Sequence, residues 1–336
     1  QPSKIRKDIK KGIKNQKVLE LANREKAISK AIKDLNTGEI LLVAGKGHET
    51  TQEIGRKKIF SSDKKIILNA IKTKNLTLSN NLKANIINEL SGEKKISPKA
   101  FLKQGRINSQ EINKKDIFFA IRGKKNDGNK FISEAFKKKA SIAIVNTINK
   151  NYNKKHQVKV NDTLKFLTKS SKIYRQNINT KIIAITGSCG KTSLKELLGS
   201  SLGQISKVSF SPKSYNNKYG VPLSLFNLKQ KDDYGVLEIG MDKKGEIDYL
   251  SKIVRPDVSV ITNITYAHAK NFKNIKQIAL AKSEIISNTK DNGFIVLNAD
   301  DNFFSLHKKL AIKKNLNIIS FGIKNKNSNI KLLDIK

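Results

Sequence analysis

The stretch TGSCGKTS combines glycine, hydroxyl and lysine side chains in a pattern that could hold a phosphate group. An apolar run precedes it and apolar residues at helical spacing follow it, so we expect it to join a buried strand to a helix. Backbone N–H groups and the positive end of a helix dipole favour an anion at such a junction. The candidate nucleotide-binding residues are Thr186, Gly187, Ser188, Cys189, Gly190, Lys191, Thr192 and Ser193.

Two of these residues have chemistry suited to ATP. Lys191 would neutralise the β- and γ-phosphates, and Thr192 would offer its hydroxyl to Mg²⁺. The strict phosphate-loop pattern requires a glycine five positions before Gly190, but Ile185 stands there. An ordinary helix cap with a neighbouring lysine is therefore the alternative interpretation.

Three residues further along the chain are candidates for a metal-binding and catalytic site. Glu238 ends a predicted buried strand, where an unpaired carboxylate would be costly. His268 lies just after another predicted strand, and Lys282 lies on the apolar face of a predicted helix. Each residue alone could be structural. Their order after the loop favours a shared site.

The elements that position these residues alternate between strand and helix from residue 181 onward. Strands are predicted at 182–186, 235–239, 257–262, 293–298 and 316–321. Helices are predicted at 191–203, 244–253, 274–287 and 301–310. This order is typical of an α/β fold with a mostly parallel sheet covered on both faces. Ligands of such sheets bind at the carboxyl ends of the strands.

The chain length of 336 residues predicts two or three domains. We expect boundaries that give units 1–72, 76–178 and 179–336, with a linker near 72–75. The first unit should contain a helix, a strand and a closing helix, at 26–35, 40–44 and 66–71. In the second, helical spacing from residue 76 to Leu90 should precede two strands, at 117–121 and 141–146, that flank a helix near 131–139.

Composition limits the class of protein. The net charge of +39 comes mostly from lysine, because only seven arginines are present, so a sequence-reading nucleic-acid protein is disfavoured. No apolar run approaches the length that a membrane helix needs. Cys189 is the only cysteine, which excludes an intrachain disulfide and fits a reducing cytoplasm. We expect a cytoplasmic monomer without nucleic-acid partners.

Several strings resemble, in order, the central ATPase domain of the Mur ligases: TGSCGKTS, YNNKYGVPLSL, VLEIGMDKKGEI, NITYAHAKNF, AKSEI and LNADD. Residues 106–135 resemble the smaller α/β UDP-sugar-binding domain of that family. The usual Asp-Ser-Arg of that domain appears here as Asn108, Ser109 and Gln110. The resemblance implies an ATP-dependent amide ligase of peptidoglycan precursor synthesis, with UDP-N-acetylmuramoyl-tripeptide and D-alanyl-D-alanine as substrates.

The resemblance also implies roles for individual residues. Thr192 and Glu238 would hold one Mg²⁺, and His268 would ligate a second. Lys282 would be carbamylated, which turns a cation into a carboxylate that orients the metal site. Asn298 and Asp300 would lie on the adenine–ribose side of the nucleotide. The residues implied to contact substrate are Ser109, Asn126, Asp127, Asn216 and Asn217.

Residues 1–72 are similar to a partial α/β domain, the C-terminal end of the Mur ligase that adds the third, diamino residue. The string GKGHE carries this similarity, and it implies that Gly45 and Glu49 help to hold an incoming amino acid. The chain begins with Gln1 and its only methionine is Met241. We therefore expect part of a fusion of two consecutive enzymes. It would lack the family's third domain and would be inactive alone.

In the mechanism that the resemblance implies, a substrate carboxylate attacks the γ-phosphate of ATP to give an acyl phosphate, which an amine then attacks. Two other functions stay open on the sequence. One is a folylpolyglutamate-synthase-like ligase with the same ATPase core, disfavoured by the UDP-sugar-like segment. The other is a basic nucleic-acid-binding NTPase, disfavoured by the scarcity of arginine.

Overall fold

The computed structural model describes residues 2–12, 18–35, 39–45, 49–54, 57–60, 62–93, 96–97, 100–123, 126–266 and 271–331. The chain divides into two compact units, Gln1–Asn80 and Asn81–Lys336, and each is described by itself. None of the helices in these described ranges has the length and apolar character that crossing a bilayer requires.

The described residues of the first unit form two helices, a hairpin and the start of a third helix. Their bounds are α1 (Pro2–Gly12), α2 (Arg24–Asp34), β1 (Thr51–Ile54), β2 (Lys57–Phe60) and α3 (Asp63–Ser91). Asn23 caps α2 by accepting from the Lys26 N–H, and Ile28 and Ile32 on this helix are buried. Arg24 binds Asp63 at the start of α3 with two of its nitrogens, so an ion pair between a half-buried arginine and a buried carboxylate ties α2 to α3.

Two predictions for the first part of the chain are wrong. No strand forms at 40–44, and Ile40 and Leu42 are exposed. A strand needs a neighbour to satisfy its backbone groups, and within the described residues β1 pairs only with β2. The expected linker at 72–75 instead lies within α3, which continues without a break to Ser91. Polar composition alone misled here, because polar side chains are also compatible with an exposed helix.

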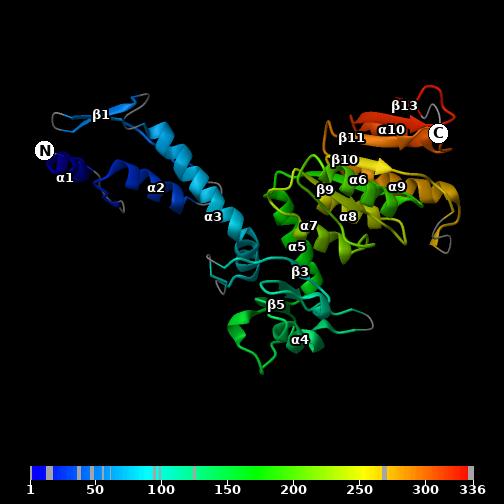
Figure 1. The fold of residues 1–336 in the computed structure, drawn as a ribbon, viewed down its shortest axis with the longest axis horizontal. Coiled ribbons are helices and arrows are strands. Elements are labelled where there is room, and N and C mark those ends of the chain that lie inside the picture. Colours follow the sequence, from blue (N-terminus) through cyan, green and yellow to red (C-terminus); the bar gives the residue numbers. More distant parts are fainter. Residues whose placement is uncertain are drawn as a thin grey trace. The chain divides into compact units, whose positions relative to one another are not determined.

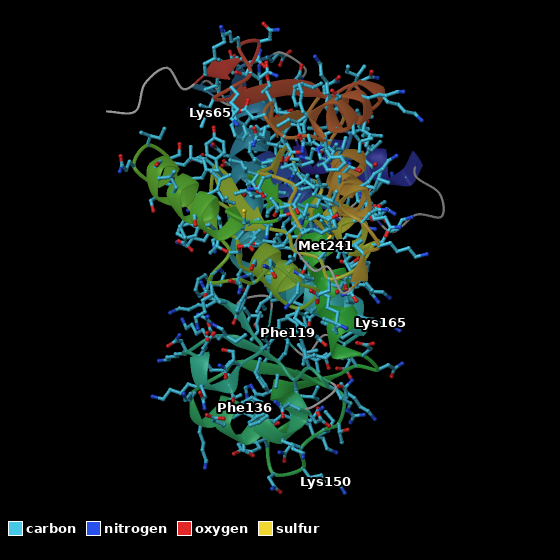
Figure 2. The ribbon with its side chains drawn as sticks, turned by 90° about the vertical axis from the view of Figure 1, so that its right-hand side faces the viewer. Lys65, Phe119, Phe136, Lys150, Lys165 and Met241 are labelled. Atoms are coloured by element: carbon cyan, nitrogen blue, oxygen red, sulfur yellow. The ribbon has the colours of Figure 1, made fainter. Side chains whose placement is uncertain are left out.

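The second unit begins with a small parallel sheet whose order is β3-β4-β5-β6. Its strands are β3 (Gly105–Arg106), β4 (Ile117–Phe119), β5 (Ile142–Val145) and β6 (Gln157–Lys159). Phe119 packs in the main core and Phe118 packs with the partly buried Phe136 of α4 (Ile132–Lys137) on the other face. Figure 2 labels Phe119 and Phe136 in this region.

Seven parallel strands of the described chain form the larger sheet, in the order β13-β12-β11-β10-β7-β9-β8. The strands are β7 (Lys181–Thr186), β8 (Val208–Phe210), β9 (Tyr234–Glu238), β10 (Val258–Ile261), β11 (Phe294–Asn298), β12 (Asn317–Gly322) and β13 (Ile330–Lys331). The helices are α5 (Thr163–Gln176), α6 (Lys191–Gly203), α7 (Gly220–Asn227), α8 (Glu246–Val254), α9 (Ile275–Asn288) and α10 (Phe304–Lys313).

Helices cover both faces of this sheet (Figure 1). Side chains alternate along β7: Ile183 and Ile185 pack with leucines of α6, whereas Ile182 and Ala184 belong to the core built with α7, α8 and α9. The five strands and four helices expected from residue 181 onward are all present, within three residues of their predicted bounds. The sequence analysis missed α7, whose residues are almost all buried and so show no polar face.

The two sheets of the second unit are joined through α5 and α7. The Asn227 side chain accepts from the Gly105 N–H at 2.7 Å and donates to the Gly105 carbonyl at 2.9 Å. The Tyr174 hydroxyl donates to the Leu228 carbonyl at 2.6 Å, and burial raises the pKa of this phenol. These bonds link β3 and α5 to α7 and the residue that follows it. The small sheet is therefore held firmly against α7.

Candidate nucleotide-binding site

The loop between β7 and α6 is shaped by two glycines. Gly187 has φ of 149° and Gly190 has φ of 78°, a left-handed conformation that glycine adopts without strain. Gly190 is also the N-cap of α6, and it provides no side-chain hydrogen bond to the first turn. The first N–H groups of α6 are therefore available to an anion, and the helix dipole favours one there.

The residues that follow β10 brace this loop from the neighbouring strand. Asn263 accepts from the Ser188 N–H through its carbonyl, at 2.9 Å, and from the Cys189 N–H through its side chain, at 3.1 Å. The Thr262 hydroxyl donates to the Cys189 carbonyl at 2.7 Å. Asp301 in turn accepts from the Ile264 N–H. The loop is therefore held open by hydrogen bonds that do not use its helix N-terminus.

Gly187 leaves no room for a side chain, which gives a first testable prediction. A Cβ there would lie 1.8 Å from the Thr262 Oγ1. We expect Gly187→Ala to lower the free energy of unfolding by about 1–3 kcal/mol through strain and overpacking, and to weaken nucleotide binding. Denaturant unfolding and ADP titration measure the two effects. Gly203→Ala at the end of α6, where an added Cβ would meet no neighbouring side chain or distant backbone within 4 Å, is the matched control and should not lower stability. Unchanged stability in Gly187→Ala would contradict this loop geometry.

Two lysines reach the same carbonyl of the loop. Lys191 Nζ donates to the Gly187 carbonyl at 2.9 Å, and Lys282 Nζ donates to it at 2.8 Å. Lys282 comes from α9 and is only 1% exposed. Burial, and then the nearby charge of Lys191, lower the pKa of Lys282 to about 7. Two cations on one carbonyl oxygen repel each other, so this arrangement favours an anion between them or a neutral Lys282 amine.

Side chains with oxygen atoms meet beside the first turn of α6. The Thr192 hydroxyl donates to Glu238 Oε2 at 2.8 Å, and Asn216 Nδ2 donates to Glu238 Oε1 at 2.7 Å. Glu238 ends β9 and is 1% exposed. A hydroxyl and a buried carboxylate next to a phosphate loop are the donors that Mg²⁺ prefers, so these residues fit the ion. Among the described residues no group of three or more His, Cys, Asp or Glu forms a metal cluster, and His268 lies outside them.

A cavity of about 620 Å³ opens next to the two lysines. Lys191 and Lys282 line one side, and Met241, which follows β9, lies on its wall. Met241 is labelled in Figure 2. Asn216 and Asn217 also line the cavity. Asn217 accepts from the N–H groups of Tyr219 and Gly220, so its side chain shapes the start of α7.

The candidate substrate residues in the segments around the small sheet differ in burial and in their hydrogen-bond partners. Ser109 is buried and donates to Glu134 Oε2 at 2.6 Å. Asn126 is exposed, and its carbonyl accepts from the Gly123 N–H. Asp127 accepts from the side chain of Asn129, from its backbone N–H and from Arg122, and these bonds lower the pKa of Asp127. Ser109 and Asp127 thus already have protein partners.

Asn298 and Asp300 lie at the carboxyl end of β11, where they line a second cavity of about 330 Å³. The Asp300 carboxylate accepts from the N–H groups of Ile323, Lys324 and Asn325, which lower the pKa of this group. The Asn298 side chain accepts from the Asp300 N–H. Asp300 therefore holds the loop after β12. Any contact between Asp300 and a ribose would add to this structural role.

In the first unit, Gly45 has φ of 108° and lies near Arg24, which also donates to the Ala44 carbonyl. Glu49 is exposed. The residues between them lie outside the described ranges.

The sequence analysis missed the residues that support the site. These are Lys195, Ser211, Thr262, Asn263 and Asp301. A signal was present for two of them: Thr262 ends the strand predicted at 257–262 and Asn263 directly follows it, at the sheet edge where ligands of parallel sheets bind. For the others the contact depends on which segments the fold brings together.

The fold and the site together define a phosphate-loop α/β protein, and residues 185–336 match the Mur ligase middle domain. This part of the chain belongs to the Mur ligase family. Within that family the chain is MurF-like, because several relatives at 32–40% identity share one name. It is 40% identical over 234 residues to the UDP-N-acetylmuramoyl-tripeptide--D-alanyl-D-alanine ligase of Buchnera aphidicola, covering 67% of this chain and 50% of the relative.

Other comparisons agree. The ligase of the same name from Rickettsia prowazekii is 37% identical over 226 residues, covering 66% of this chain and 50% of that protein. The MurF structure from Acinetobacter baumannii has a TM-score of 0.65 at 30% identity, covering 75% of this chain and 55% of that one. MurF from Thermotoga maritima in complex with ADP has a TM-score of 0.57 at 32% identity, covering 66% and 51%. The chain spans about half the length of these relatives.

Proposed function

We propose that this chain is the UDP-substrate-binding and ATP-binding part of a ligase that joins D-alanyl-D-alanine to UDP-N-acetylmuramoyl-tripeptide in peptidoglycan synthesis. The observation that carries the proposal is the pair Lys191 and Lys282 on the Gly187 carbonyl, beside the Thr192–Glu238 contact. The names of its relatives support the choice of substrates. We place the protein in the cytoplasm, where these precursors would be built.

We propose that each domain binds one ligand: residues 76–178 bind the UDP-muramoyl peptide, and residues 179–336 bind ATP. Residues 1–72 would be the end of a preceding ligase, with Gly45 and Glu49 toward an amino acid. Asn126, Asn216 and Asn217 would lie on the path of the peptide substrate, and Asn298 and Asp300 near the adenosine. His268 would be a further metal ligand.

The chemistry proposed has two steps. A carboxylate oxygen of the tripeptide attacks the γ-phosphorus, the bond from that phosphorus to the β–γ bridging oxygen breaks, and ADP leaves. The amine of D-alanyl-D-alanine then attacks the acyl carbon, loses a proton, and inorganic phosphate leaves. Lys191 and the N–H groups of α6 would hold the phosphates in line, which is the main requirement of phosphoryl transfer.

Thr192 and Glu238 would hold Mg²⁺, which supplies positive charge to the phosphate oxygens when bound. Lys282 is proposed to be carbamylated. Its amine would lose a proton and form an N–C bond with CO₂, which gives a negatively charged carbamate. The lowered pKa supports this, because only the neutral amine reacts with CO₂. A carbamate would also relieve the repulsion between Lys191 and Lys282.

Calorimetric titration of the 336-residue chain tests the proposal. We expect saturable binding of ADP that strengthens with Mg²⁺, and saturable binding of UDP-N-acetylmuramoyl-tripeptide. Dihydrofolate is the control for a folylpolyglutamate-synthase-like ligase, and double-stranded DNA at moderate salt is the control for a nucleic-acid-binding NTPase. Tight binding of either control without binding of the UDP-peptide would overturn the proposal.

A further inference from the structure

Lys195 differs from the many exposed lysines of this chain. It lies one turn after Lys191 on α6, and its side chain is 0% exposed. Its Nζ donates to the Lys213 carbonyl at 2.5 Å and lies 3.0 Å from Glu196 Oε1. Burying an ammonium group is costly unless partners compensate for its lost hydration. A solvent-facing lysine would avoid that cost, so this buried contact calls for a function.

The segment that receives this bond, residues 211–217, contacts Glu238 on both sides of Lys213. Ser211 accepts from the Glu238 N–H at 3.3 Å through its hydroxyl, and Asn216 donates to Glu238 Oε1. The Asn216 carbonyl also accepts from the Gly240 N–H just beyond β9. Lys195 therefore fixes the middle of a segment whose flanking residues orient one carboxylate.

Lys213 shows why the segment needs fixing. Its φ of 47° is in the left-handed region, which a lysine backbone occupies only with strain. The hydrogen bond from Lys195 to its carbonyl offsets part of that strain. Without the bond, the backbone would be free to relax and would carry Asn216 away from Glu238.

We propose that Lys195 is a positioning residue for the metal–nucleotide site. Two residues of α6 would then orient the two carboxylate oxygens of Glu238. Thr192 contacts Oε2 directly. Lys195 acts on Oε1 indirectly, because it holds the segment that carries Asn216. The inference rests on the proposed function in one respect, since it takes Thr192 and Glu238 to be the residues that hold Mg²⁺.

The test is the Mg²⁺ dependence of ADP binding by the full chain. In Lys195→Met, which keeps the side-chain length and removes the charge, the Mg²⁺ concentration for half-maximal enhancement should rise about tenfold, as for loss of other groups that orient metal ligands. ADP binding without Mg²⁺ should stay within about twofold, because the N–H groups at the start of α6 and Lys191 remain. Lys195→Arg should restore part of the Mg²⁺ response.

Lys252→Met on α8 is the matched control, because Lys252 is exposed and its Nζ binds Asp248 at 2.6 Å, away from the loop. It should behave as the unmodified chain. Unchanged Mg²⁺ dependence in Lys195→Met would overturn the inference, and so would an equal loss of binding with and without Mg²⁺, which indicates a general structural role. A chain without any Mg²⁺-dependent ADP binding would instead overturn the proposed function itself.

If Lys195→Met does not fold, Ser211→Ala tests whether residues 211–217 orient Glu238. This variant removes the hydroxyl that accepts from the Glu238 N–H and changes little else in volume. A raised Mg²⁺ requirement with normal metal-free ADP binding would support the bracing of Glu238 by residues 211–217. A normal Mg²⁺ response in Ser211→Ala would then overturn it.

Discussion

Lys191→Ala is expected to weaken binding of a non-hydrolysable ATP analogue about 10- to 100-fold, which corresponds to the ~1.5–3 kcal/mol of a charge-assisted hydrogen bond. In the structure the ammonium group rests on the Gly187 and Ser188 carbonyls, at 2.9 and 3.3 Å. A bound β- or γ-phosphate would offer it a stronger, charged acceptor. Removing the group leaves that negative charge without its nearest cation.

Comparison of ligands sharpens this test. AMP, which lacks both distal phosphates, should bind the variant and the unmodified chain with similar affinity, whereas the ATP analogue should not. Lys207→Ala, at an exposed lysine before β8, is the control for loss of one positive charge from a very basic chain. Equal affinity of Lys191→Ala and the unmodified chain for the ATP analogue would show that residues 187–191 are not a phosphate loop.

If Lys282 carries the proposed carbamate, Lys282→Ala is expected to lower the Mg²⁺ affinity of the nucleotide complex about 10- to 100-fold, as loss of an outer metal-orienting group does. Binding of ADP without metal should change little, because Lys191 and the N-terminus of α6 remain. Acetate or formate at millimolar concentration should restore part of the Mg²⁺ response by occupying the space of the carbamate.

The carbamate proposed at Lys282 would give a ¹³C NMR signal after addition of ¹³CO₂. The pKa of Lys282 is lowered to about 7, so its neutral fraction, and with it the carbamate signal, should increase as pH rises through 7. Lys282→Ala should lack the signal, and Lys276→Ala on the same helix should keep it. A signal that persists in Lys282→Ala, or a normal Mg²⁺ response in that variant, would refute the proposed modification.

The sequence was most informative where one local rule applied. Strict placement of Gly187, Gly190 and Lys191 between an apolar run and a helical pattern predicted the strand–loop–helix unit, because backbone conformation and burial at those positions depend on nearby residues. The strand at 40–44 had a similar apolar run and did not form. Whether residues 40–44 form a strand depends on whether a second strand lies beside them, and a local sequence pattern does not contain that information.

By itself, therefore, the sequence determined the parallel α/β class, the phosphate loop and the order in which Thr192, Glu238 and Lys282 follow one another. Only the tertiary structure decided that Lys282 reaches the Gly187 carbonyl, that Asn216 and Ser211 hold Glu238, and that Lys195 is buried behind them. These contacts join residues up to 95 positions apart in the chain. Their existence depends on strand order and helix packing, since hydrogen bonds form between groups that the fold brings within about 3 Å of each other.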